Sequence, residues 1–329
     1  MTRRILVTGV GGAPGFDLAA SCRDLGNTVI AVDCDPHAPG LRMPGVEPHL
    51  TLPAADAGYR TALLRLVQEC RPHAILSTVE QELGHLLALR RPLADSGVTT
   101  WLPPAAAVEA CTDKAHFAHV LAVHGIPGPV TLLPDDVDQA PDGLLVVKPR
   151  SGQGSRHVHL CRSREQARVL CSLIGEAIVQ EHVTGTEFTA DCLVDRGGRA
   201  SVILRHRLLV KGGLAVVSRT FTDAGAEACV RAVLTATGLR GACCVQGFIR
   251  GPHDEPSGSS GPGRVVITEA NARIAGAFTT SVAAGADYIG EYLRGLFHHD
   301  VNHNRLTYRR DVTLTKYQAT LTSTQGAPS

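Results

Sequence analysis

The sequence predicts an α/β fold in its amino-terminal third and mixed α+β lobes in the remainder. In the first third, short runs rich in β-branched residues alternate with helical patterns; the runs lie at 5–8, 29–33 and 74–78, and the helices at 16–25 and 59–70. Strands that alternate with helices in this way form a parallel sheet covered by helices. After Pro103-Pro104, which marks a turn, the strands become longer and several alternate with period two.

The elements of the second part follow in a definite order. A helix is predicted over 112–124, with Thr112 as its amino-terminal cap and Gly125-Ile126-Pro127 as its stop. After it we expect strands at 144–150, 178–182, 187–195 and 201–210, a helix at 224–237, and two long strands at 241–250 and 264–273. The segment that joins the last two strands, 251–263, is polar and rich in Gly and Pro, as in a hairpin tip.

The composition of the chain argues against several classes of protein. The 329 residues carry a formal net charge of +1, with 44% hydrophobic and 19% charged residues. This balance argues against a dedicated nucleic-acid binder or a polybasic protein that docks on membranes. The ten cysteines form no CxxC pair, so they are interpreted as buried thiols in a reducing compartment. With no secretory start and no apolar run near the ~20 residues that span a bilayer, we expect a cytoplasmic protein.

A glycine-rich segment, TGVGGAPG at 8–15, follows the first strand, and Asp33 ends the second. This arrangement can place a phosphate on a helix amino terminus and a ribose on the acid. An NAD(P)-dependent oxidoreductase or epimerase of the extended short-chain type is therefore an alternative function. Such an enzyme needs a lysine four positions after a tyrosine, and none of the five tyrosines has one. We favour the interpretation that these glycines let a helix pack closely on the sheet.

A second loop, after Lys148, is better suited to binding phosphate than the segment at 8–15. Lys148 leaves the strand at 144–150, and SGQGS follows at 151–155. Backbone N–H groups of such a loop can face phosphate oxygens while the ammonium offsets their charge. A solvated lysine before a surface loop would give the same pattern. The next strand turns polar at Gln180-Glu181, where its backbone could meet an adenine edge, and Glu187 could accept hydrogen bonds from ribose hydroxyls.

The strand at 264–273 carries the strongest signal. Because side chains alternate along a strand, Glu269, Asn271 and Arg273 share one face. Gln246, on the other strand of the hairpin, is expected beside Glu269. Three oxygen donors on paired strands suit Mg²⁺, which keeps waters and phosphate oxygens as its other ligands. Arg273 could hold a developing oxyanion or an acyl phosphate.

In this order the elements resemble the ATP-grasp ligases, in particular the branch similar to carbamoyl-phosphate synthase large-chain modules and stand-alone amino-acid ligases. The matching pieces are Thr112-Asp113-Lys114 with Gly125-Ile126-Pro127, Lys148-Pro149 with its loop, Gln180-Glu181-His182-Val183 with Gly185 and Glu187, and Gln246, Glu269, Asn271 and Arg273. The segments VDCDP at 32–36 and EQEL at 80–83 resemble the domain that precedes the grasp. The resemblance spans residues 1 to about 290. His157 departs from it, because many relatives have glycine there.

The resemblance implies an ATP-grasp fold with an amino-terminal Rossmann-like pre-grasp domain that binds no dinucleotide. We expect that domain at 1–110, a small lobe with the central lysine and phosphate lid at 111–180, a carboxyl-terminal lobe with the metal and substrate site at 181–310, and a tail at 311–329.

The resemblance also implies roles for individual residues. The cofactors would be ATP and Mg²⁺, with Mn²⁺ as a substitute. Nucleotide contacts are expected from Lys114, Lys148, Ser151, Gly152, Gly154, Ser155, Gln180, Glu181, His182, Val183 and Glu187. The metal ligands would be Gln246, Glu269 and Asn271. Arg273 would stabilise the reacting group, and Arg205, Arg207 and Lys211 would add to this cationic pocket.

The expected reaction joins a small-molecule carboxylate to an amine through an acyl phosphate and releases ADP and phosphate. Amino acids or small peptides are the expected substrates, which would make the chain an amino-acid ligase of peptide-bond-forming biosynthesis. No nucleic-acid or membrane partner is expected, and relatives commonly form homodimers. A non-catalytic ATP-binding protein is a further alternative.

Overall fold

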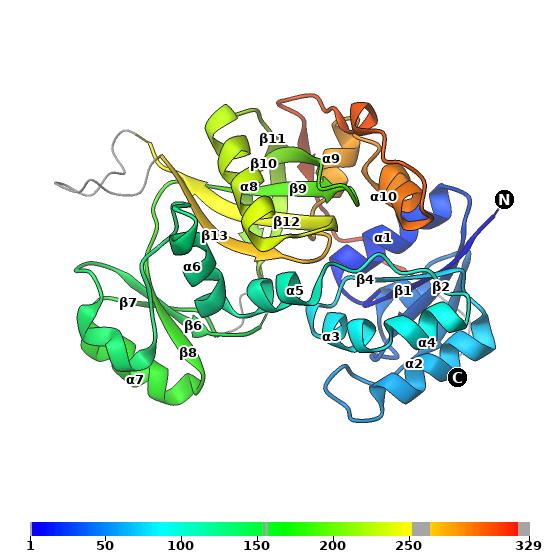
Figure 1. Cartoon of the computed structure of the whole chain (residues 1–329), viewed down its shortest axis with the longest axis horizontal. Coiled ribbons are helices and arrows are strands. Elements are labelled where there is room, and N and C mark those ends of the chain that lie inside the picture. The colour runs from blue at the N-terminus through cyan, green and yellow to red at the C-terminus, as the bar shows by residue number, and fades with distance from the viewer. Residues whose placement is uncertain (1, 153, 155–156, 252–263, 322–329) are drawn as a thin grey trace.

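The computed structural model describes residues 2–152, 154, 157–251 and 264–321. Figure 1 shows three sheets: the amino-terminal sheet at the right, a small sheet at the left and a large sheet above them. The polar segment expected as a hairpin tip falls almost entirely outside the described residues. Within them, no helix is long and apolar enough to cross a membrane.

The amino-terminal domain is built on a four-stranded parallel sheet with the order β3-β2-β1-β4. Its strands are β1 (Arg4–Thr8), β2 (Thr28–Asp33), β3 (Val46–Leu50) and β4 (Ala74–Ser77), and its helices are α1 (Ala13–Asp24), α2 (Tyr59–Cys70), α3 (Glu80–Ala88) and α4 (Arg90–Asp95). Ile5 and Val7 pack into one core and Leu6 into another, because successive strand residues face opposite sides of a sheet. The α/β prediction for this domain is confirmed.

The small sheet has the order β5-β8-β6-β7, and all of its pairs are antiparallel. It comprises β5 (Thr131–Leu132), β6 (Leu145–Pro149), β7 (His159–Cys161) and β8 (Ala177–Glu181), with α7 (Arg164–Ile174) packed against it. The helices α5 (Ala105–Thr112) and α6 (Lys114–Val123) lead into this sheet.

The predicted helix cap at Thr112 is wrong. Thr112 ends α5, and its hydroxyl donates to the Val108 carbonyl at 2.8 Å. Asp113 caps α6 instead, since its carboxylate accepts the Ala115 N–H at 2.9 Å.

The large sheet has the order β13-β12-β9-β10-β11-β14 and is antiparallel throughout. Its strands are β9 (Thr186–Val194), β10 (Ala200–Lys211), β11 (Leu214–Thr220), β12 (Gly241–Ile249), β13 (Val265–Asn271) and β14 (Thr313–Thr315). The last of these lies in the segment expected as a tail. The helices associated with the large sheet are α8 (Ala224–Thr237), α9 (Thr279–Ala283) and α10 (Tyr288–Leu296).

The two faces of the large sheet have different roles. Phe188, Ala190 and Cys192 of β9 point toward α8 and form a core with Ala226 and Val230. The alternate positions of β9 therefore face the other side, where the small sheet and the amino-terminal domain lie. This second face carries the candidate site.

Candidate active site

The predicted pairing of the two late strands is present. Gln246 on β12 lies directly opposite Glu269 on β13, just before a β-bulge in β12. Asn271, two residues along β13, is opposite Cys244 and is 1% exposed. One amide, one carboxylate and a second amide thus lie on one face of the sheet.

The strand register extends this row across four strands. Gln246 is also opposite Thr189 on β9, and Thr189 is opposite Arg205 on β10. The row therefore reads Glu269, Gln246, Thr189, Arg205. Thr189 is fully buried, and its hydroxyl has no hydrogen-bond partner among the described residues. Thr189 did not stand out in the sequence, because one hydroxyl inside an apolar strand carries no signal.

A cavity of about 1040 Å³ opens over this row. Both sheets and the amino-terminal domain line it. The predicted site residues at its surface are Lys114, Lys148, Ser151, Gly152, Gly154, Gln180, Glu181, His182, Val183, Glu187, Arg205, Arg207, Gln246, Glu269, Asn271 and Arg273. Ser155 lies outside the described residues. Lys211 does not line the cavity.

Lys148 on β6 of the small sheet and Glu269 on β13 of the large sheet line the same cavity. Burial lowers the pKa of Lys148 to about 8, although the nearby Glu269 carboxylate raises it. Glu269 itself forms no hydrogen bond or ion pair within the described part of the chain. A half-buried ammonium and an unpaired half-buried carboxylate therefore share one cavity, an arrangement suited to a polyanion and a cation together.

The loop after Lys148 is open on its cavity side. Gly152 and Gly154 have φ of 136° and 73°, and a methyl group at either would meet no atom within 4 Å. The Lys114 ammonium donates to the Gly152 carbonyl at 2.9 Å, so the second lysine holds this loop. His157 has φ of 56°, a left-handed conformation that favours glycine.

The end of strand β8 has fewer free backbone and side-chain groups than its sequence suggested. The Glu181 N–H donates to the Val130 carbonyl at 2.9 Å, and the His182 N–H to the Leu144 carbonyl at 3.0 Å. The Gln180 side chain donates to the Thr131 hydroxyl at 2.8 Å. The backbone N–H of Val183, which lines the cavity, forms no such bond within the described residues.

Arg207 and Lys211 differ from the expected cationic pocket. Arg207 forms an ion pair with Glu187 at 3.0 Å and donates to the Gly213 carbonyl at 2.9 Å, so an acid compensates its charge. Lys211 ends β10 and is exposed near the hairpin tip. Two bulges in β10, between Arg207 and Val210, change its register against β11. A strict period-two reading therefore misplaces Lys211.

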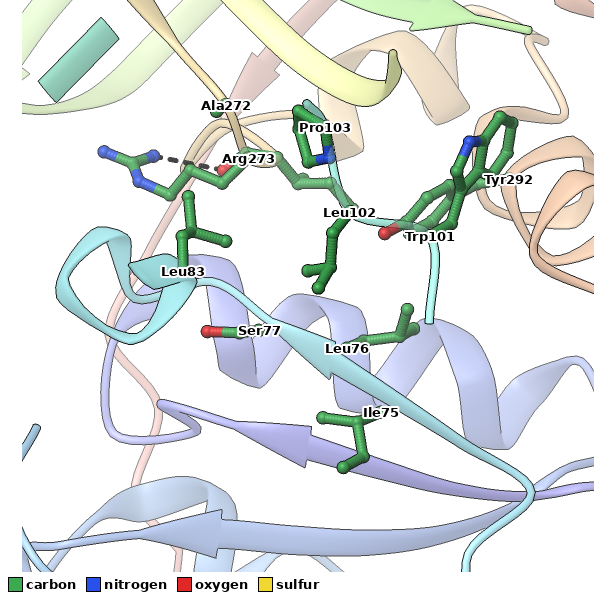
Figure 2. A pocket seen from close by; sticks show the side chains of 11 residues that line it. Ile75, Leu76, Ser77, Leu83, Trp101, Leu102, Pro103, Ala272, Arg273 and Tyr292 are labelled. Carbon is green, nitrogen blue, oxygen red and sulfur yellow. Dashed lines mark hydrogen bonds between the residues drawn. The ribbon is translucent and has the colours of Figure 1, made fainter. Parts of the chain in front are cut away.

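Arg273 follows β13 at the junction with the amino-terminal domain. Its Nη2 donates to the Asn271 side-chain oxygen at 3.2 Å, and its Nη1 to the Ile274 carbonyl at 3.1 Å. Figure 2 shows the guanidinium directed away from a cavity of about 20 Å³ behind it, which Leu83 and Trp101 help to line. That volume holds about one water. Arg273 is thus supported from the amino-terminal side and presents its charge to the large cavity.

Glu80, at the start of α3, was not predicted as a site residue. It is 7% exposed, and burial raises its pKa to about 7, while the nearby Arg273 lowers it. The polar run EQE at 80–82 is typical of an exposed segment, so the sequence did not indicate that Glu80 is buried near Arg273.

The amino-terminal glycine motif serves close packing. A methyl group at Gly15 would lie 2.1 Å from the Gly9 carbonyl oxygen, so α1 approaches the preceding turn as closely as only glycine permits. The Asp33 carboxylate accepts the Gly11 N–H at 2.7 Å. That amide would otherwise be available to a pyrophosphate, so the geometry disfavours a dinucleotide at this turn.

No group of three or more His, Cys, Asp and Glu side chains suited to a metal occurs among the described residues. The oxygen donors at Gln246, Glu269 and Asn271 include two amides, and their hard, weakly charged set suits Mg²⁺ better than Zn²⁺. The ten cysteines are all free.

Comparisons with known proteins agree with this geometry. A family model described as an ATP-grasp domain matches residues 111–277. No curated protein matches the chain. Among solved structures, an N5-carboxyaminoimidazole synthetase from Staphylococcus aureus complexed with ADP is 15% identical, with a TM-score of 0.71 over 91% of this chain and 78% of that one.

Two further solved structures belong to other enzymes. A biotin carboxylase from Campylobacter jejuni in complex with β-γ-ATP is 11% identical, with a TM-score of 0.70 over 92% of this chain and 72% of that one. An L-amino acid ligase from Bacillus licheniformis is 16% identical, with a TM-score of 0.70 over 90% and 74%. At these identities the likeness is one of fold.

Proposed function

The chain belongs to the ATP-grasp family of ATP-dependent, ADP-producing ligases, and from this premise we propose that it joins a small carboxylic acid to an amine through an acyl phosphate. The observation that carries the proposal is that Lys148 and the paired residues Gln246 and Glu269 line one cavity. We assign residues 1–110 to the pre-grasp domain, 111–180 to the small lobe and 181–310 to the carboxyl-terminal lobe.

The nucleotide is proposed to lie between the small and the large sheet. The Val183 N–H, which has no backbone partner among the described residues, would meet the adenine, and Glu187, which pairs with Arg207, would accept the ribose hydroxyls. Lys148 and the open loop at Gly152 and Gly154 would meet the phosphates. Bringing phosphate oxygens to Lys148 offsets the burial that lowers its pKa, so its protonated form is the one that binds.

Mg²⁺ fits the donors of the large sheet. Glu269 supplies an unpaired carboxylate, and Gln246 and Asn271 supply amide oxygens on the same face. Such a set leaves coordination positions for waters and phosphate oxygens. When bound, the ion would neutralise charge on the terminal phosphates during phosphoryl transfer.

The proposed reaction has two steps. A substrate carboxylate oxygen attacks the terminal phosphorus, the bond to the ADP oxygen breaks, and an acyl phosphate forms. The amine then attacks the acyl carbon, loses a proton and displaces phosphate. Arg273 would hold the carboxylate before transfer and the carbonyl oxygen afterwards, since its Nε is buried without a partner among the described residues.

We propose amino acids or small peptides as substrates. The fold of the L-amino acid ligase supports this choice, and the cavity continues past Arg273 to the amino-terminal domain, where Gly12 and Pro14 line it. The folds of two other enzymes match equally well. A screen should therefore include bicarbonate among the acids.

The test measures ADP release with twenty proteinogenic L-amino acids in pairs, with bicarbonate, and with hydroxylamine as a general amine that converts an acyl phosphate to a hydroxamate. We expect ADP and product to form together, and Glu269→Gln to lower turnover at least 100-fold by removing the charged donor. Glu227→Gln is the matched control, because Glu227 lies on α8 and pairs with Arg231 outside the cavity. Equal turnover in both variants would defeat the metal assignment. Nucleotide binding without ADP release under any pair would favour a non-catalytic ATP-binding protein.

A further inference from the structure

Three buried polar side chains form a network beside the cavity. Asp191 on β9 accepts Nε and Nη2 of Arg205 at 2.9 and 3.1 Å. The Ser281 hydroxyl of α9 donates to the same carboxylate at 2.5 Å. Asp191 and Ser281 are 0% exposed and Arg205 is 1% exposed. The network connects two strands of the large sheet to a helix that follows the Arg273 turn.

This network leaves one end of Arg205 free. Its Nη1 is buried and has no hydrogen-bond partner within the described residues, although Arg205 lines the cavity. A buried donor without a partner is destabilising, and a buried ion pair is often no more stable than an apolar pair of the same size. Stability alone therefore does not account for an arginine at this position, whereas a ligand that accepts from Nη1 does.

Arg273 approaches the same place from the other side. Asn271, to which Arg273 donates, is opposite Cys244, and Cys244 is opposite Asp191. In the sheet order, β12 and β9 lie between β13, which precedes Arg273, and β10, which carries Arg205, and both arginines line the cavity. Arg273 also has a buried nitrogen, Nε, without a partner among the described residues.

We propose that Asp191 and Ser281 are positioning residues that hold Arg205 so that Arg205 and Arg273 bind the carboxylate of the acid substrate from two sides. The proposal rests on the proposed function. Two unpartnered donors on two arginines match the two oxygens of a carboxylate. Asp191 compensates the charge of Arg205, so Asp191, Arg205 and Arg273 together carry one net positive charge, which matches a monocarboxylate.

The experiment compares Ser281→Ala with Ser218→Ala. Ser218 on β11 is also buried, and its hydroxyl forms a hydrogen bond at 2.7 Å with Thr280 of α9, the helix that carries Ser281. Ser218 forms no hydrogen bond with Asp191. The acid probe is an equimolar mixture of the twenty proteinogenic L-amino acids, with saturating hydroxylamine as the amine, and hydroxamate and ADP are both measured. Ser281→Ala should raise KM for the amino-acid mixture about tenfold and leave KM for ATP within about twofold. Ser218→Ala should change neither.

Thermal unfolding of both variants separates positioning from stability. The proposal is supported if both variants lose a similar amount of stability and only Ser281→Ala changes the KM for the acid. Asp191→Asn, which removes the charge that orients Arg205, should raise the acid KM further. If Ser281→Ala keeps the wild-type KM for the mixture, or if acid and ATP KM rise together, the positioning role is overturned while the ligase function stands. If the wild-type protein releases no ADP with any acid, the proposed function fails and this inference fails with it.

Discussion

Replacing Lys148 by methionine should stabilise the ligand-free chain while it abolishes ATP binding. Burial lowers the pKa of Lys148 from 10.5 to about 8 in the folded protein. At ~1.4 kcal/mol per pH unit, that shift corresponds to roughly 2 to 3 kcal/mol against the charged form, after allowance for partial exposure. Methionine has a similar length and no charge, so it removes this destabilisation together with the contact to phosphate.

The sign of the effect gives it a characteristic pH dependence. Because the folded pKa lies below the unfolded one, the destabilisation is complete below pH 8 and disappears as the pH rises through 10.5. The stability gain of Lys148→Met should therefore be largest at pH 7 and fall to about half near pH 9.5. Urea unfolding at both pH values measures it, with ATP binding followed by equilibrium dialysis.

Lys316→Met provides the control. The Lys316 ammonium pairs with Asp17 of α1 and does not line the cavity, so its loss should stabilise nothing. A Lys148→Met protein that is less stable than wild type at pH 7, or whose gain in stability is the same at both pH values, would contradict a buried, destabilising ammonium at this position.

Two further predictions concern the framework of the site. Asp113→Ala removes the cap of α6 and the ion pair with Arg150, and the cap alone contributes about 1 kcal/mol. Arg150 lowers the pKa of Asp113. The wild-type protein should therefore be more stable to urea than the variant at pH values above the ordinary carboxyl pKa. This difference in stability should be lost as the pH falls through the lowered pKa. Gly15→Ala places a methyl group 2.1 Å from the Gly9 carbonyl and should destabilise the chain by roughly 3 kcal/mol; a wild-type melting temperature would contradict the close packing of α1.

The fold was predictable because its determinants are periodic. Alternation with period two set Glu269, Asn271 and Arg273 on one face and brought Gln246 opposite Glu269, and the register confirms the pairing. β3 was missed because its sequence, VEPHL, contains a proline and two polar residues. Proline is tolerated there because β3 is an edge strand, which a single sequence does not reveal.

The composition of the charged pocket was less predictable. Three cationic residues along β10 suggested one cationic surface, yet Asp191 compensates Arg205, Glu187 compensates Arg207, and Lys211 is exposed. These partners lie on a neighbouring strand, so the strand register decides which charges remain. The cap of α6 was predicted at Thr112, but α5 ends at that residue, so Asp113 forms the cap instead.

A crystal structure of the chain with Mg²⁺ and a non-hydrolysable ATP analogue would locate the triphosphate and the metal ion in the cavity. We expect the triphosphate beside Lys148 and a Glu269 oxygen about 2.1 Å from the ion. A nucleotide bound at the Gly9–Gly15 turn, or a metal ion that contacts neither Glu269 nor Gln246, would contradict this expectation.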